Sequence, residues 1–265
     1  MARDIPHIKR KEYDVMSNKP IPVKLRKLMQ GVLKKTTIGR MIYPTVQKCW
    51  RWYIIPKRRR LLQENGAKVL HDIHDLMTWC NIPYYCDAGT LLGLIRDKGF
   101  IPHDDDIDIS IRAETICPAQ VLKALIDAGY VFLHAFRYED TITEFTVLAK
   151  CGLSIDVFFH KKAKREGYIY AWQPFWEANK SYPTENANSL VEFEFVAPVK
   201  LIPYEILGIT TMIPENYIAV LESSYGPWQT PDAKFDTVNH RIHRNLPGCA
   251  YRITAKEVLD TQLEK

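Results

Sequence analysis

Residues 84–111 read YYCDAGTLLGLIRDKGFIPHDDDIDISI, and the last residues of this stretch have the pattern of a β-strand. From residue 106 onward polar and apolar residues alternate, which predicts a strand over residues 106–111. Because the side chains of a strand alternate between its two faces, Asp106 and Asp108 are expected together on one face. The isoleucines of the strand are then expected on the opposite face, in the core.

A cluster of aspartates lies at the start of this strand and repels itself unless a cation binds to it. Its members are Asp104, Asp105, Asp106 and Asp108. Carboxylates two residues apart on one strand face suit Mg²⁺, which uses one or two protein carboxylates and completes its coordination with water and substrate phosphate. Asp106 and Asp108 are therefore the predicted metal ligands, and metal-assisted phosphoryl transfer is the working hypothesis.

A further carboxylate stands alone in the apolar segment LSIDVFF, residues 153–159. A buried, unpaired Asp156 would be costly, and a metal shared with Asp106 and Asp108 removes that cost. Asp156 is therefore the predicted third ligand. The alternative is a structural Asp156 that pairs with an arginine or caps a turn.

The segment before the aspartates offers groups that can bind phosphate. Gly89 and Thr90 begin a predicted helix over residues 89–96, where backbone N–H groups and a hydroxyl can meet an anion. Arg96 and Lys98 follow, and they are candidates for contact with phosphate oxygens. For both, an ordinary surface charge is nearly as good an interpretation.

The composition indicates a globular chain. With 265 residues and 46% hydrophobic content, it can bury a sizeable core. The six cysteines are scattered without a CxxC pair, which favours reduced thiols and a cytoplasmic location. No run of 18 apolar residues is present, and the N-terminus lacks the apolar region of a secretory signal.

The charge is distributed unevenly. Residues 1–60 contain 17 Lys and Arg against 3 Asp and Glu, whereas the remaining residues contain 19 against 28. The prediction is a basic N-terminal extension over residues 1–60 and a catalytic domain over residues 61–265. Apolar residues at helical spacing between Leu25 and Leu33 predict a basic amphipathic helix there.

Two uses of this extension stay open. Residues 22–60 could contact the inner face of the cell membrane peripherally, or the helix could dock on the catalytic domain with its basic side in solvent. Nucleic acid is not expected as a partner, because no helix-turn-helix, zinc-finger or RNP-type pattern is present.

The rest of the chain alternates between helical and strand patterns. Helices are predicted over residues 61–80, over residues 113–129 and from Pro214 onward, with short strands between residues 130 and 213 that are interrupted at Pro198 and Pro203. This order predicts an α+β fold with a mixed sheet flanked by helices.

Three separated segments together resemble one known family. They are NIPYYCDAGTLLGLIRDKGFIPHDDDIDISI (residues 81–111), LSIDVFF (residues 153–159) and VKLIPYEILGITTMIPENYIAVLESSYGPWQTP (residues 199–231). The chain resembles the LicD family of phosphotransferases, relatives of the fukutin-related proteins. One residue departs from the family pattern, because His103 stands where a tryptophan is common; any stacking contact there is in doubt.

The resemblance implies a nucleotidyltransferase-like fold and a reaction. That reaction transfers a substituted phosphate, such as phosphocholine or ribitol phosphate, from a CDP-linked donor to a hydroxyl of a glycan acceptor, with or without a lipid link. The matching positions place the metal at Asp106 and Asp108, with Asp156 third, and the turn at Gly89 and Thr90.

The expected chemistry needs a cation and a base. The cofactor is Mg²⁺, with Mn²⁺ as the alternative, and Asp156 is the first candidate for the base, ahead of Asp104. Two other functions stay open. One is a nucleotidyltransferase that moves a nucleoside monophosphate from NTP; the other is a non-enzymatic protein that binds membrane or nucleic acid.

Overall fold

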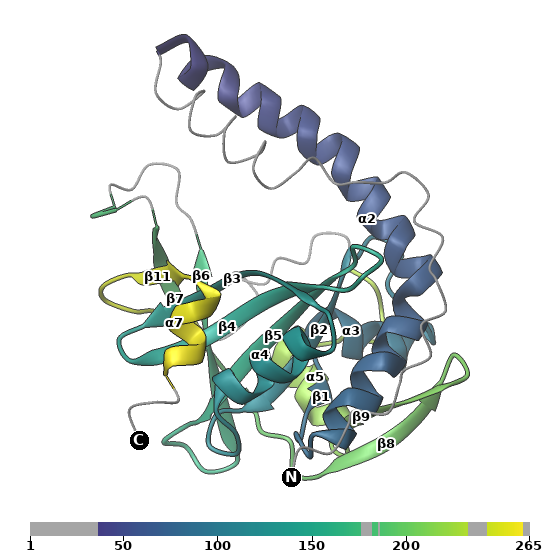
Figure 1. Cartoon of the computed structure of the whole chain (residues 1–265). Coiled ribbons are helices and arrows are strands. Elements are labelled where there is room, and N and C mark those ends of the chain that lie inside the picture. Colours follow the sequence, from purple (N-terminus) through teal and green to yellow (C-terminus); the bar gives the residue numbers. More distant parts are fainter. Residues whose placement is uncertain (1–36, 176–181, 185, 233–242, 262–265) are drawn as a thin grey trace. The chain divides into compact units, whose positions relative to one another are not determined.

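The computed structural model describes residues 37–175, 182–184, 186–232 and 243–261. The chain divides into two compact units, Met1–Pro56 and Lys57–Lys265. The strands described below all belong to the second unit (Figure 1). The helix predicted between Leu25 and Leu33 lies outside the described residues.

Helix α2 spans Thr37–Trp79 and includes the helix predicted over residues 61–80. Its apolar residues recur at helical spacing and are almost fully buried: Leu62, Val69, Leu70, Ile73 and Met77. They pack into the main hydrophobic core, which explains why this part of the helix forms. Among the described helices, none combines the length and apolar character needed to cross a bilayer.

Nine strands form one large sheet, and a separate hairpin adds two more among the described residues. Neighbouring strands follow the order β1-β2-β5-β4-β3-β11-β7-β10, and β6 pairs with both β5 and β7. The strands of the sheet are β1 Tyr85–Cys86, β2 Asp106–Arg112, β3 Val131–Tyr138, β4 Thr141–Leu148, β5 Ser154–Lys162, β6 Tyr168–Phe175, β7 Ala187–Val196, β10 His243–Asn245 and β11 Ala250–Ile253. The hairpin consists of β8 Leu201–Ile206 and β9 Ile209–Pro214.

Helices accompany this sheet. They are α3 Ala88–Leu92, which continues into the π-helical turn η1 Gly93–Asp97, then α4 Pro118–Asp127, α5 Tyr217–Tyr225 and α7 Ala255–Asp260. Helix α4 packs against α7 and β3, and α3 packs against β2. The predicted α+β class with a mixed sheet and helices is therefore confirmed.

The pair β2 and β5 gives the sheet its mixed character. These two strands are parallel, whereas the other described pairs are antiparallel. The chain between them forms α4 and the hairpin β3–β4, which supplies the long connection that parallel neighbours need. Because β4 also pairs with β5, the two parallel strands are held from one side by an antiparallel ladder.

Strand β2 has the predicted alternation. Ile107, Ile109 and Ile111 have no exposed surface and lie in the core, and Asp106 and Asp108 occupy alternate positions. The predicted division of the strand into an apolar face and a carboxylate face is confirmed.

Two predictions around prolines were wrong. Pro203 lies inside β8, opposite Met212 of β9, and does not interrupt a strand. Pro214 ends β9, and the helix begins only at Tyr217. Both prolines lie in a hairpin of two strands, and among the described residues the outer edge of each strand is unpaired and needs no N–H donor.

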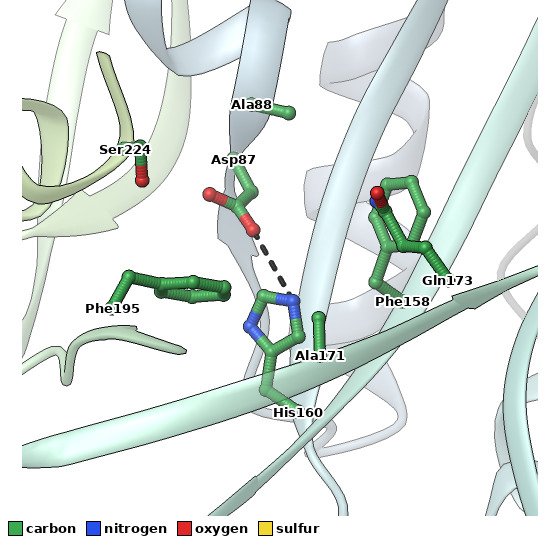
Figure 2. Close-up of a pocket in the computed structure, with 8 residues that line it drawn as sticks. All are labelled: Asp87, Ala88, Phe158, His160, Ala171, Gln173, Phe195 and Ser224. Atoms are coloured by element: carbon green, nitrogen blue, oxygen red, sulfur yellow. Dashed lines mark ion pairs between the residues drawn. The ribbon is translucent and has the colours of Figure 1, made fainter. Parts of the chain in front are cut away.

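A buried polar network fixes the residue before α3. Asp87 accepts a hydrogen bond from Ser110 Oγ (2.6 Å), and His160 Nε2 lies 3.5 Å from the same carboxylate oxygen. Figure 2 shows the Asp87 carboxylate directed toward the His160 ring, whose Nδ1 lies 2.7 Å from the Tyr85 hydroxyl. The cavity beside this network has room for about one water molecule. We therefore assign the network a supporting role: it anchors β1 and the start of α3 against β2 and β5.

Candidate active site

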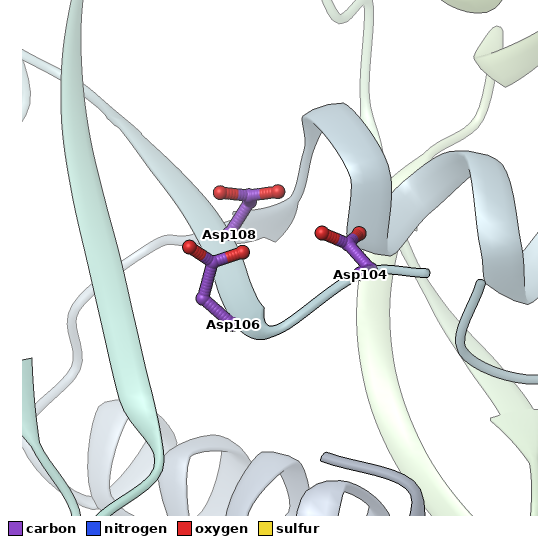
Figure 3. A group of neighbouring side chains, drawn as sticks. All are labelled: Asp104, Asp106 and Asp108. Atoms are coloured by element: carbon purple, nitrogen blue, oxygen red, sulfur yellow. The ribbon is translucent and has the colours of Figure 1, made fainter. Parts of the chain in front are cut away.

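Three carboxylates meet where β2 begins. Oxygen atoms of Asp104, Asp106 and Asp108 all lie within 4.8 Å of one another, and Figure 3 shows the three side chains converging. Asp106 and Asp108 come from the strand, whereas Asp104 comes from the loop before it. The sequence interpretation gave Asp104 only a secondary role, and the structure brings it into the same group.

Asp156 lies beside this group on the neighbouring strand. It is the register partner of Asp108 on the parallel strands β2 and β5, so the two side chains are on the same face of the sheet. Its Oδ1 accepts a hydrogen bond from Thr146 Oγ1 (2.7 Å). The role of Asp156 as third ligand stays a prediction.

The carboxylates hold their protons more tightly than exposed aspartates do. Burial, followed by the charges of Asp156 and Asp104, raises the pKa of Asp106 from 3.8 to about 8. Burial and the charge of Asp106 raise the pKa of Asp108 well above its usual range. The group is therefore under strong electrostatic repulsion when all its members are ionised.

A hard divalent cation fits this donor set. The closely spaced ligand atoms are all carboxylate oxygens, which Mg²⁺ and Mn²⁺ accept, and no softer ligand belongs to the group among the described residues. A cation would also offset the mutual repulsion of these carboxylates, which adds to the effect of burial on their pKa values. Its presence stays a prediction.

Gly89 and Thr90 hold Asp108 in place. The Gly89 N–H donates to Asp108 Oδ2 (3.1 Å), and the Thr90 hydroxyl accepts from the Asp108 backbone N–H (2.8 Å). A β-carbon at Gly89 would overlap the Asp104 carboxylate, so a larger residue there would displace a member of the group. Both residues were predicted to meet phosphate; in the structure they orient a carboxylate of the group.

The residue before Gly89 is in an unusual conformation. Ala88 has φ 43°, in the left-handed region that residues with a β-carbon rarely adopt. It lies between Asp87, held by the buried network, and Gly89, held by Asp108. The contacts on both sides therefore maintain a strained turn directly beside the carboxylates.

Arg58 is a site residue that the sequence interpretation missed. Its Nε lies 3.1 Å from Asp105 Oδ2, and its Nη2 lies 3.7 Å from Asp106 Oδ2. The sequence interpretation counted it with the basic residues of the extension over residues 1–60. No local pattern could separate it from the neighbouring basic residues, because its partners Asp105 and Asp106 lie far along the chain.

Arg96 and Lys98 lie at the other end of the α3–η1 helical segment. The Arg96 guanidinium binds its neighbour Asp97 through Nε (2.8 Å) and Nη2 (2.9 Å). Lys98 is exposed and ends the π-helical turn in the left-handed region. Neither has a described contact with the carboxylate group, so their predicted contact with phosphate stays a prediction.

Glu144 is a second residue that was missed. It lies on β4, two positions from Thr146 and therefore on the same face. Burial and the charge of Asp156 raise the pKa of Glu144 well above its usual range. Its polar position within an alternating strand is the only sequence signal, and that signal also fits an exposed residue.

The fold and the site define a mixed α+β domain whose acidic centre is built on the neighbouring parallel strands β2 and β5 and on the loop before β2. A family model described as "LicD/FKTN/FKRP, nucleotidyltransferase domain" matches residues 81–216, just over half of the chain. The chain belongs to this family.

Several curated proteins are similar over part of their length. An uncharacterized protein of Rickettsia typhi is 32% identical over 164 residues, which cover 58% of this chain and 51% of that protein. Ribitol-5-phosphate transferase FKTN of Mus musculus is 23% identical, over 69% of this chain and 36% of the relative. Lipopolysaccharide cholinephosphotransferase LicD of Haemophilus influenzae is 26% identical, over 70% of this chain and 81% of the relative.

This chain spans about half the length, or less, of the first relatives it matches. Among solved structures, the lincosamide antibiotic adenylyltransferase LnuA with bound lincomycin matches with a TM-score of 0.36 and 15% identity. That match covers 58% of this chain and 83% of LnuA. At this TM-score the likeness supports no conclusion about the chain.

Proposed function

We propose that this chain transfers a substituted phosphate, of the phosphocholine or polyol phosphate type, from a CDP-activated donor to a hydroxyl of a cell-surface glycan or its lipid-linked precursor. Membership of the LicD/FKTN/FKRP family supports a phosphate-group transferase. The observation that carries the proposal is the carboxylate group at β2, with Asp156 in register beside it on β5.

The carboxylates have distinct tasks in this proposal. Asp106 and Asp108 would hold Mg²⁺ or Mn²⁺, with Asp156 as the third ligand and the charge of Asp104 beside them. A bound divalent cation supplies positive charge against the phosphoryl oxygens of the donor. Gly89 keeps Asp108 aligned through its backbone N–H.

The reaction requires one bond to form, one to break and one proton to move. The acceptor hydroxyl oxygen bonds to the phosphorus that carries the alcohol, and the bond from that phosphorus to the bridging oxygen breaks. CMP leaves with the electron pair. A carboxylate takes the proton of the hydroxyl, and Asp156 is the first candidate and Asp104 the second. Burial raises the pKa of both carboxyl groups, which makes each a stronger base than an exposed aspartate.

Arg58 is the residue proposed to meet the donor phosphates. Its guanidinium already lies beside Asp105 and Asp106, and its side chain is 36% exposed to solvent. A planar guanidinium can bind two phosphate oxygens at once. It would therefore bring positive charge to the donor from the side of α2.

The released product tests the proposed reaction. The chain is incubated with Mg²⁺, a panel of CDP-alcohols or NTPs, and a glycan acceptor. Release of CMP that depends on the CDP-alcohol and on the acceptor is expected. Pyrophosphate released from an NTP would instead support the nucleotidyltransferase alternative, and the absence of both products across the panel would contradict the proposal.

A further inference from the structure

Four residues form a single row across the sheet. Asp108 on β2 pairs in register with Asp156 on β5, Asp156 pairs with Thr146 on β4, and Thr146 pairs with His134 on β3. Register partners place their side chains on the same face of a sheet. The row therefore leads from the carboxylate group to a histidine two strands beyond Asp156.

Hydrogen bonds connect the last three members of this row. Thr146 Oγ1 donates to Asp156 Oδ1 over 2.7 Å, and His134 Nε2 lies 3.2 Å from the same hydroxyl oxygen. A threonine hydroxyl has one proton. Because that proton is directed to Asp156, the contact with His134 is one that the hydroxyl accepts, and His134 Nε2 carries a hydrogen.

The position of Thr146 limits what could replace it. The residue is 6% exposed, so water has little access to the hydroxyl. Thr146 thereby engages Asp156 Oδ1, and no hydrogen bond to Oδ2 is present among the described residues. Outer hydrogen-bond partners of this kind orient the ligands of metal sites.

We propose that Thr146 and His134 are positioning residues that orient the Asp156 side chain, with Oδ1 held by Thr146 and Oδ2 available to the metal centre. The inference rests on the proposed function only in requiring a divalent cation at the carboxylate group. Neither residue touches the reacting atoms; both act through Asp156.

Mn²⁺ binding tests this proposal independently of turnover. The full chain and its variants are titrated with Mn²⁺ at one fixed pH, and free Mn²⁺ is followed by electron paramagnetic resonance. Thr146→Val removes the hydroxyl at nearly constant volume and is expected to weaken Mn²⁺ binding about tenfold or more. Thr146→Ser retains the hydroxyl and is expected to restore most of the affinity.

Thr143→Val is the matched control on the same strand. Thr143 is also buried, but its hydroxyl is directed to the Phe136 backbone carbonyl (3.4 Å) and lies outside the row. The Thr143→Val variant should therefore have the Mn²⁺ affinity of the unaltered chain. The Tm of each metal-free variant is measured in parallel, because a packing defect would lower the Tm without a selective effect on Mn²⁺.

The two changes at His134 separate hydrogen bonding from packing. His134→Gln can still present an N–H near the position of Nε2, and it should retain Mn²⁺ affinity, whereas His134→Leu should weaken it. Unchanged affinity in Thr146→Val, or equal affinities in the two His134 variants, would overturn the proposal. If the unaltered chain binds no Mn²⁺, the positioning role and the metal centre are both wrong; if it binds Mn²⁺ but releases no CMP, only the proposed reaction is wrong.

Discussion

Asp108 and Asp156 are register partners on the parallel strands β2 and β5. The parallel pairing brings an aspartate from each of two distant segments to the same face of the sheet. If either aspartate stood one residue earlier or later in its strand, its carboxylate would point to the opposite, apolar face of the sheet. The acidic centre therefore depends on strand register as much as on residue type.

The first prediction concerns the carboxylates of β2. Asp106→Asn or Asp108→Asn should reduce Mg²⁺-dependent turnover by roughly 100-fold or more, because the cation loses a charged ligand. Above about pH 8, where Asp106 is ionised, the metal-free Tm of Asp106→Asn should exceed that of the unaltered chain, since the change removes a buried charge that Asp156 and Asp104 repel. Kinetic assays and thermal unfolding with a chelator measure the two effects.

A surface aspartate provides the control for these variants. Asp127 pairs with Lys123 (2.7 Å) on the exposed side of α4, so Asp127→Asn should leave turnover unchanged. Full activity in both β2 variants would contradict a catalytic role for Asp106 and Asp108.

The second prediction concerns pH. The pKa of Asp106 is about 8 in the folded chain, against 3.8 for an ordinary aspartate, so between these values the folded state binds more protons than the unfolded state. The stability of the metal-free chain should therefore fall as pH rises from about 4 to about 8. Divalent cations replace protons at such sites, so Mg²⁺ affinity should rise over the same range.

Thermal unfolding at several pH values, with chelator and with Mg²⁺, checks both trends. In Asp106→Asn the fall in metal-free stability should be smaller, because this group no longer titrates. If metal-free stability changes with pH equally in the variant and in the unaltered chain, the pH dependence comes from groups other than Asp106.

Some of this site could be predicted from the sequence, and the reason is local. Alternation in β2 predicted the face that Asp106 and Asp108 share, and an isolated carboxylate in an apolar strand singled out Asp156. Both predictions are possible because the alternation of side chains within a strand follows from its own sequence and does not depend on which strands pair with it.

The missed residues depend on contacts between distant segments. Arg58 reaches Asp105 and Asp106 from α2, and a run of basic residues does not show which member turns inward. Thr146 and His134 face Asp156 only because of the register of β3, β4 and β5, and β3 has an irregularity between Phe132 and His134. Such a shift cannot be derived from propensity or alternation.

The third prediction concerns the turn beside the carboxylates. Gly89→Ala should reduce turnover strongly and lower the Tm, because a β-carbon there overlaps the Asp104 carboxylate and is close to Asp108. Gly99→Ala is the matched control, since a β-carbon at Gly99 has open space around it. Equal effects of the two changes would show that close approach is not what requires glycine at position 89.

The fourth prediction concerns the basic extension. We propose that residues 22–60 contact anionic membrane surfaces, as the excess of Lys and Arg over residues 1–60 suggests. Replacing Lys24, Lys27, Lys34 and Lys35 with Glu should weaken sedimentation with vesicles that contain anionic lipid. Binding of the unaltered chain should be lost at high salt, because the attraction is screened. Unchanged sedimentation of the variant would rule this contact out.

The fifth prediction separates two roles of Arg58. Arg58→Gln removes a guanidinium that lies near Asp106 and competes with a cation for the same carboxylates, so Mn²⁺ affinity should stay the same or rise. The KM for the CDP-linked donor should rise by roughly tenfold or more, because a charge-assisted contact with phosphate is lost. Arg60→Gln is the control, since Arg60 pairs with Glu64 on the exposed side of α2. A loss of donor affinity without a loss of metal affinity would identify Arg58 as a phosphate-binding residue; a parallel loss of both would show that it only maintains the arrangement of the carboxylates.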